Sequence, residues 1–382
     1  MERINHPPSA YEVLVVREYQ QNIGGTRRRL ENILNAIRNR SETTKEALID
    51  ARPWMEPGWY RIVGNTAWKI SATKKAKHRN LYQGILKRSI YGNIARFIEL
   101  LEQFYPPLIL RLQDSGSRGC GTHLLVPLSH GNKKIFDLKN DRVVSFYSHR
   151  KAEQLKNSQE LLETYYPISS LQFRNHSEEN IVVESLINGP NYNESSRAQQ
   201  LHVIDVLIQG ASKALNNGDI HYWSDDEIES ICMRYRSSDI PSRWSSFIDE
   251  RMMSVRQNMK NLPLIPCHLD LHVDNILFGP EGPQFIDIMT ADRYPAFFDM
   301  LSLVINAYCH DIENLLFDFI RDGNPSYKKG LINSIFGIRC QDTLLATFIV
   351  IYLSRADNHL DQWRCIDQLE NELNIVYNKG ME

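Results

Sequence analysis

A short polar segment between apolar runs carries the side chains best suited to chemistry. His268 and Asp270 follow the apolar residues 262–267, Asn275 stands five residues after Asp270, and Asp287 ends a later apolar run. Phosphoryl transfer needs a carboxylate that orients the acceptor hydroxyl and oxygen ligands for a Mg²⁺ ion that bridges the phosphates. The spacing therefore predicts Asp270 as the catalytic carboxylate, with Asn275 and Asp287 as ligands of Mg²⁺.

Two other interpretations fit the same segment. The stretch His-x-Asp-x-His-x-Asp, which starts at His268, also offers ligands for Zn²⁺ or Mn²⁺ in a metallohydrolase, although its order differs from the metal motifs of those enzymes. As a purely structural loop, His268 would brace the turn by hydrogen bonds, and Asp270 and Asp274 would be solvated turn residues. Because four groups occur in the order that phosphoryl transfer needs, the sequence favours that chemistry.

The segment HLDLHVDNILF, followed by QFIDI, resembles the catalytic and metal loops of a known family. That family is the aminoglycoside phosphotransferase and choline kinase branch of the protein-kinase-like superfamily. His272, two residues after Asp270, is similar to the small-molecule kinases, whereas protein Ser/Thr kinases usually carry Lys there. The resemblance covers about residues 108–380. It implies ATP and Mg²⁺ as cofactors, His268 and Asp270 as catalytic residues, and a hydroxyl of a sugar, aminoglycoside or other small molecule as acceptor.

The resemblance also implies positions for nucleotide binding. Residues 181–189 are similar to the hinge strand, in which the Glu184 carbonyl and the Leu186 amide would bind adenine. Asp299 resembles an aspartate that braces the catalytic loop. A glycine-rich segment would let backbone N–H groups approach phosphates, with an ordinary turn as the alternative; its glycines are Gly116, Gly119 and Gly121.

One expected residue is missing. The strand that should carry an ATP-binding lysine is predicted over residues 142–147 and contains none. Lys151, at the start of the next helix, or Lys134, on the preceding strand, would substitute, and Lys151 is slightly favoured. The sequence leaves the partner carboxylate open among Glu153, Glu160 and Glu163. The missing lysine motivates an alternative function, a pseudokinase-type nucleotide-binding regulatory module, and protein kinase activity is a further alternative.

Hydrophobic patterning predicts the elements that position these residues. Alternation and turn signals such as Asn140-Asp141 predict a small antiparallel sheet with one helix over residues 150–165. The strands are expected at residues 122–129, 134–138, 143–147, 171–174 and 181–184. Apolar spacing near 3.6 residues predicts helices through most of the remainder. These are expected at residues 195–216, 225–235, 243–261, 297–308, 312–321, 327–336 and 342–377, the last with a break near 357–358.

Composition shows a split in charge between the two ends of the chain. The 382 residues carry a formal net charge of only −2, which excludes a uniformly basic nucleic-acid binder. Residues 1–100 hold 18 Lys and Arg against 9 Asp and Glu, and the remainder holds 26 against 37. The basic N-terminal region, with aromatic residues beside a Lys-rich run at 69–79, is interpreted as a site for an anionic ligand or a membrane surface, or as a solvated charged face.

Together these patterns predict an α+β chain with a bilobal protein-kinase-like fold. A basic, mainly helical extension is expected over residues 1–106, a small antiparallel-sheet N-lobe over 107–189, and a mainly helical C-lobe with the catalytic and metal loops over 190–382. Six dispersed cysteines without a Cys-x-x-Cys pair and the absence of a 20-residue apolar run predict a cytoplasmic protein without a transmembrane segment.

Overall fold

The computed structural model describes most of the chain beyond residue 107 and three shorter pieces before it. The described residues are 41–51, 54–63, 66–69, 108–112, 121, 123–125, 133–137, 139–176, 179–187, 189–218, 220–236, 238, 240–322, 325–338, 340–355 and 363–378. They fall into two compact units. Unit 1 comprises Met1–Gln154 and Ser169–Asn188, and unit 2 comprises Leu155–Ile168 and Gly189–Glu382.

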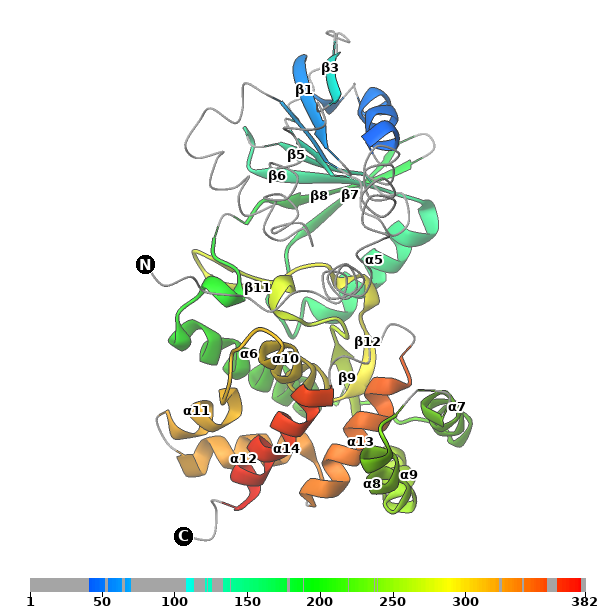
Figure 1. The fold of residues 1–382 in the computed structure, drawn as a ribbon, viewed down its shortest axis with the longest axis vertical. Coiled ribbons are helices and arrows are strands. Elements are labelled where there is room, and N and C mark those ends of the chain that lie inside the picture. Colours follow the sequence, from blue (N-terminus) through cyan, green and yellow to red (C-terminus); the bar gives the residue numbers. More distant parts are fainter. Residues whose placement is uncertain are drawn as a thin grey trace, which may run out of the picture. The chain divides into compact units, whose positions relative to one another are not determined.

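Unit 1 is organised around an antiparallel sheet (Figure 1). Its eight described strands lie in the order β3-β1-β2-β4-β5-β6-β8-β7, with each neighbouring pair antiparallel. Their bounds are β1 Gly58–Val63, β2 Thr66–Lys69, β3 Leu108–Leu112, β4 His123–Leu125, β5 Lys133–Asp137, β6 Arg142–Tyr147, β7 Leu171–His176 and β8 Glu179–Ser185. Helix α5 (His149–Leu162) follows β6. The predicted order of three strands, one helix and two strands is therefore found in β4 to β8.

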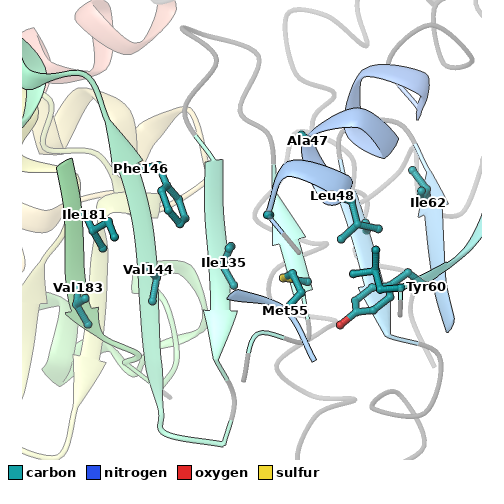
Figure 2. Packing of buried hydrophobic residues seen from close by; sticks show 13 residues of the cluster. Ala47, Leu48, Met55, Tyr60, Ile62, Ile135, Val144, Phe146, Ile181 and Val183 are labelled. Atoms are coloured by element: carbon teal, nitrogen blue, oxygen red, sulfur yellow. The ribbon is translucent and has the colours of Figure 1, made fainter. Parts of the chain in front are cut away.

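A buried apolar cluster forms on one face of this sheet. The helix over residues 41–50 contributes Leu48, which is fully buried, and β1 contributes Tyr60 and Ile62. Ile135 of β5 and Val144 of β6 are cross-strand partners in the same cluster, and Figure 2 shows them on adjacent strands. Because successive side chains of a strand point to opposite faces, the neighbours of these residues in sequence lie on the other face.

The sheet extends further toward the N-terminus than the sequence predicts. Residues 1–106 are predicted to be a mainly helical extension separate from the sheet, and within the described part of that range only residues 41–50 form an α-helix. Strands β1 and β2 pair with β3 and β4, so they belong to the same sheet as residues 108–185. The aromatic and β-branched residues of these strands favour their pairing. Apart from Lys69, the basic run at 69–79 lies outside the described residues.

Unit 2 is mainly helical. Helix α6 begins with a capping box, in which Ser196 accepts from the Gln199 backbone and Gln199 accepts from the Ser196 backbone. Beyond its polar first turn, helix α13 is almost entirely apolar and buried, as expected of a helix in the middle of a unit. The helices are α6 Arg197–Asn216, α7 Asp225–Arg236, α8 Ser242–Asp249, α9 Met252–Asn261, α10 Phe298–Tyr308, α11 Leu315–Arg321, α12 Pro325–Phe336, α13 Gln341–Leu353 and α14 Trp363–Asn378.

The helix predictions hold in position, with one break that the apolar spacing does not predict. The helix expected over residues 243–261 is divided between α8 and α9, because the chain turns at Glu250 and Arg251. Between α9 and α10 the chain forms two short antiparallel pairs. These are β9 (Leu264–Cys267) with β12 (Asp292–Pro295), and β10 (Ile276–Gly279) with β11 (Gly282–Phe285).

The predicted α+β class is confirmed: a small antiparallel sheet precedes a mainly helical remainder. Among the described residues, no helix is both long and apolar enough to cross a membrane.

Candidate active site

The predicted catalytic and metal-binding residues lie in the turns that join the short strands of unit 2. All four residues of β9 are buried, and the turn that contains Asp270 follows directly. The hairpin of β10 and β11 pairs Ile276 with Phe285, and just beyond this pair the Ile286 amide donates to the Asn275 carbonyl at 3.0 Å. The chain therefore brings Asn275 next to the residue that precedes Asp287.

Asp299, at the start of α10, fixes the backbone of the turn after β9, residues 268–275, which is named the catalytic turn after the role predicted for Asp270. Its carboxylate accepts from the amides of His268 at 2.6 Å and Leu269 at 2.9 Å. Leu269 has a φ of +66°, a conformation that a branched side chain seldom adopts and that its surroundings must hold. Burial raises the pKa of Asp299 to about 6, and the two backbone donors act in the opposite direction. The bracing role that the resemblance implies for Asp299 thus has a direct geometric basis.

His268 is an internal strut rather than a solvent-facing group. Its side chain is buried, and its Nε2 atom lies 2.9 Å from the Ile286 carbonyl. A carbonyl only accepts, so Nε2 carries the proton, and within the described part of the chain the buried Nδ1 atom has no hydrogen-bond partner. Burial lowers the pKa of His268 to about 4, so the ring is neutral at pH 7. With 1% exposure the ring is shielded from solvent. The geometry fits the bracing alternative, with His268 joining the catalytic turn to the segment before Asp287.

Asp270 faces solvent from this braced turn. Its side chain is 51% exposed, and its Oδ2 atom lies 4.0 Å from Nε2 of His272. Asn275 is buried and donates its Nδ2 to the Asp270 backbone carbonyl at 2.8 Å. That bond fixes the Asn275 amide and leaves its oxygen as the end available to a cation. The structure thus presents one exposed carboxylate beside one anchored amide.

Asp287 follows β11 with a left-handed backbone, φ +59° and ψ +49°. This conformation is several times more common for Asp and Asn than for other non-glycine residues. Asn275 and Asp287 supply hard oxygen donors, which suit Mg²⁺ when phosphates and water complete the coordination. The donor set therefore fits the predicted ion. Across the described residues, no group of three or more His, Cys, Asp and Glu side chains is placed to hold a metal ion.

Two residues that position the turn are not predicted from the sequence motif. Thr290 donates its hydroxyl to the His268 carbonyl at 3.1 Å, and Asn306 accepts from the Val273 amide through Oδ1 at 2.9 Å. Asn306 lies in α10, two turns after Asp299, so the same helix holds both ends of the catalytic turn. A polar residue two turns from Asp299 on a helix that is otherwise nearly all buried is the signal that could have identified it.

In unit 1, the predicted glycine-rich segment is described only at Gly121, and Gly116 and Gly119 lie outside the described residues. Gly121 donates its amide to the Trp54 carbonyl at 2.9 Å. A Cβ atom there would lie 2.3 Å from Cγ2 of Ile135, so packing alone requires glycine at this position. A phosphate-binding role for these glycines stays a prediction.

The predicted hinge residues lie at the end of β8, with Glu184 inside the strand and Leu186 directly after it. Glu184 pairs with Val143 of β6 and with Leu171 of β7. The Leu186 amide donates to the Asp141 carbonyl at 2.8 Å. Adenine binding at these positions stays a prediction, and for Leu186 it requires that the amide exchange this partner for the base.

The two candidate lysines occupy different elements. Strand β6 contains no lysine, as the sequence shows. Lys134 of β5 lies directly across from Ser145 of β6, on the sheet face opposite the apolar cluster. Lys151 lies in the first turn of α5. Of the three predicted partner carboxylates, Glu160 pairs with Lys156 at 3.7 Å and Glu163 accepts from Gln159 at 3.2 Å, whereas Glu153 is exposed.

Comparison with known proteins adds structural neighbours. No protein-family profile matches the sequence, and no curated protein matches it. A thermostable mutant of the aminoglycoside phosphotransferase APH(4)-Ia is similar at a TM-score of 0.43 and 13% identity, over 74% of this chain and 98% of the other. An amicoumacin kinase in complex with AMP-PNP and Ca²⁺ is similar at a TM-score of 0.42 and 11% identity, over 67% and 88%. An ethanolamine kinase of Plasmodium vivax gives a TM-score of 0.39 and 12% identity, over 67% and 83%. The chain resembles the aminoglycoside phosphotransferase and choline kinase-like branch in its motif, and its structural neighbours carry names from that branch.

Proposed function

We propose that the protein is an ATP- and Mg²⁺-dependent phosphotransferase that phosphorylates a hydroxyl group of a small molecule. The observation that carries this proposal is the catalytic turn. There, an exposed Asp270 and an anchored Asn275 are held by the Asp299 brace, and Ile286 bonds Asn275 just before Asp287. A turn built only for stability has no need of a half-exposed carboxylate beside an anchored amide oxygen.

In this proposal the residues have separate tasks. Asp270 accepts a hydrogen bond from the acceptor hydroxyl, orients it toward the phosphorus and takes up its proton. Asn275 and Asp287 would hold Mg²⁺, which supplies charge neutralisation at the phosphate oxygens when bound. His268, Thr290 and Asn306 are positioning residues, since each contacts the backbone of the turns. The chemistry thus depends on a framework that keeps two turns in register.

We further propose that Lys134, rather than Lys151, is the cation for the nucleotide phosphates. Cross-strand partners on one face have Cβ atoms about 4.5–5.5 Å apart, so Lys134 enters the same part of the sheet face as Ser145. The Ser145 hydroxyl is buried and has no hydrogen-bond partner among the described residues. Serine at this point of β6 leaves room for the longer side chain from β5. A lysine from the neighbouring strand would then compensate for the lysine missing from β6.

The function is tested by incubating the protein with labelled ATP and Mg²⁺ over a panel of sugars, aminoglycosides, amino alcohols and peptides. Transfer to a small hydroxyl compound, lost with EDTA, is the expected result. Transfer to peptides only would support a protein kinase instead. Nucleotide binding without transfer to any acceptor would support the pseudokinase-type module, and absence of nucleotide binding would overturn both.

The lysine assignment is tested separately by equilibrium binding of a fluorescent ATP analogue. Lys134→Ala should raise Kd at least about tenfold, as expected for loss of a charge-assisted phosphate contact, whereas Lys151→Ala should change it less than twofold. The exchange variant Lys134→Ser with Ser145→Lys should restore binding, because it moves the lysine to the directly opposite position. The reverse ranking of the two alanine variants would assign the role to Lys151.

A further inference from the structure

Two cysteines of unit 2 lie in direct contact outside the candidate site. Cys309 directly follows α10 and is partly exposed, and Cys365 lies in the first turn of α14 and is buried. Their sulfur atoms are 2.8 Å apart, although 56 positions separate them in the sequence. The other described cysteines are Cys232 and Cys267, both buried, and Cys340, which is exposed.

The separation of the two sulfurs is close to that of a covalent bond. A disulfide has an S–S length of about 2.05 Å, so the two sulfurs need to approach by only about 0.8 Å. Both cysteines lie at the ends of helices, where side chains adjust with little disturbance of the helix.

The proton distribution in the pair favours reaction. The hydrogen bond between the thiols, with burial, raises the pKa of Cys309, and the same bond lowers the pKa of Cys365. Cys365 is therefore the better source of a thiolate, which is the nucleophilic form of cysteine. Cys309 is partly exposed, so it is the thiol through which solvent reaches the pair.

We propose that Cys309 and Cys365 form an oxidisable dithiol, a modification site that a hydroperoxide converts to a disulfide and a dithiol reductant restores. The Cys365 thiolate attacks one oxygen of hydrogen peroxide, the O–O bond breaks, and a sulfenic acid and hydroxide result. The Cys309 sulfur then attacks the sulfenic sulfur and its proton leaves with the hydroxyl group as water. The proton released when the Cys365 thiol ionises converts the hydroxide to water, so that in total two thiols and one peroxide give one disulfide and two waters.

The bridge would act on the helix that supports the catalytic turn. Helix α10 carries Asp299 and Asn306, and Cys309 follows Asn306 by three residues. A disulfide to α14 fixes the C-terminal end of that helix and closes a long loop. Closing a loop of this length restricts the unfolded chain, so oxidation should raise the Tm of unit 2 by about 5–10 °C.

The test uses the full chain with Cys120→Ser and Cys340→Ser, which removes the exposed thiol and the cysteine outside the described residues. After treatment with hydrogen peroxide and quenching, the intact mass should fall by about 2 Da, as the loss of two hydrogens requires. Digestion without reductant should yield one linked peptide that contains Cys309 and Cys365, and dithiothreitol should release it. Cys309→Ser and Cys365→Ser in the same background should each abolish the mass loss, and Cys232→Ser should retain it.

The proposal is overturned if peroxide adds oxygen to either cysteine without producing the linked peptide, or if both cysteines are still alkylated by iodoacetamide after treatment. Peptide mapping of the unsubstituted pair decides the question even where a serine variant folds poorly. No readout involves phosphoryl transfer, so the result stands apart from the proposed function.

Discussion

Unit 1 and unit 2 each contain a buried aspartate that organises a turn, and the two differ in where their donors come from. Asp137 accepts from the Asn140 backbone and side chain and from Nε of Arg142, all within five residues. Asp299 accepts from two backbone amides that lie 30 and 31 residues earlier. The first aspartate shapes its own hairpin, whereas the second holds a distant turn from which an exposed carboxylate projects. The hydrogen bonds of Asp137 therefore stabilise a local hairpin, whereas those of Asp299 hold in place the turn that presents Asp270.

The largest effect is expected for Asp270 and Asp287, the two carboxylates to which the proposed function assigns chemistry. Asp270→Asn and Asp287→Asn should each lower kcat by about 10³-fold or more, because they act on charge that develops in the transition state. Asn tolerates the left-handed backbone of Asp287, so the Tm should stay within about 2 °C of the original. Steady-state kinetics and thermal unfolding measure the two quantities. Asp274→Asn, a 41% exposed neighbour in the same turn, serves as the matched control and should keep its kcat. Equal losses in all three variants would contradict the site assignment.

Removing the two buried aspartates should separate stability from activity. Asp299→Ala leaves two buried amides without their acceptor and should lower the free energy of unfolding of unit 2 by about 3–5 kcal/mol, with a large fall in kcat. Asp137→Ala should cost about 1–3 kcal/mol, because Arg142 is 38% exposed and can be rehydrated. Urea unfolding and kinetics at a temperature where both variants are folded measure these changes. A kcat loss as large for Asp137→Ala as for Asp299→Ala would remove the distinction between the two braces.

The pH dependence of stability should show two opposed contributions in unit 2. The folded pKa of Asp299, about 6, lies above its ordinary value of 3.8, so its contribution to stability falls as pH rises from about 4 to 6. The folded pKa of His268, about 4, lies below its ordinary value of 6.5, so its contribution rises over nearly the same range. Each slope is at most about 1.4 kcal/mol per pH unit. The two largely offset each other in the unsubstituted protein.

Single substitutions separate the contribution of each group to the pH dependence of the free energy of unfolding. Asp299→Asn should make the free energy of unfolding rise more steeply between pH 4 and 6, and His268→Gln should make it fall with pH over the same interval. Urea titrations at half-unit intervals of pH measure both. Parallel curves for the two variants would show that neither group has a shifted pKa in the folded state.

The smallest expected effect concerns the hydroxyl that joins the two turns. Thr290→Val removes the hydrogen bond to the His268 carbonyl with little change of shape, and should lower the free energy of unfolding by about 1 kcal/mol. If Thr290 positions the turn, kcat should fall even at a temperature where the variant is fully folded, while KM for ATP stays constant. Thr290→Ser, which keeps the hydroxyl, should recover kcat. Failure of the serine variant to recover it would make the role of Thr290 purely one of packing.

The sequence predicts the catalytic turn better than the residues that support it. Asp270, Asn275 and Asp287 stand in a fixed spacing, and the apolar runs around them predict where the chain turns. The residues that support this turn do not follow a short spacing in the sequence. Asn306 and Thr290 act through hydrogen bonds that form only when β9, β11 and α10 come together in the fold. The sequence suggests Asp299 through a resemblance and gives no reason for its position.

Prediction from the sequence is limited in the same way for the sheet of unit 1. Alternation predicts β5, β6 and β8, and the Asn140-Asp141 turn signal correctly marks the hairpin between the first two. The sequence does not predict that β1 and β2 join this sheet, because strand pairing between distant segments depends on contacts that no local pattern records. Nor does it predict that Lys134 faces Ser145, since a shift of one residue in register would place the lysine on the other face.

Gly189 links the start of unit 2 to the strand that follows Asn275 in a way that bears on evolution. A Cβ atom at this position would lie 1.7 Å from the Phe278 carbonyl oxygen, and the Phe278 amide donates to the neighbouring Pro190 carbonyl at 3.0 Å. Phe278 belongs to β10, which begins directly after Asn275. Any side chain at position 189 would push this strand away. We therefore expect natural variants and deep mutational libraries to tolerate almost no substitution at Gly189, although it takes no part in the chemistry.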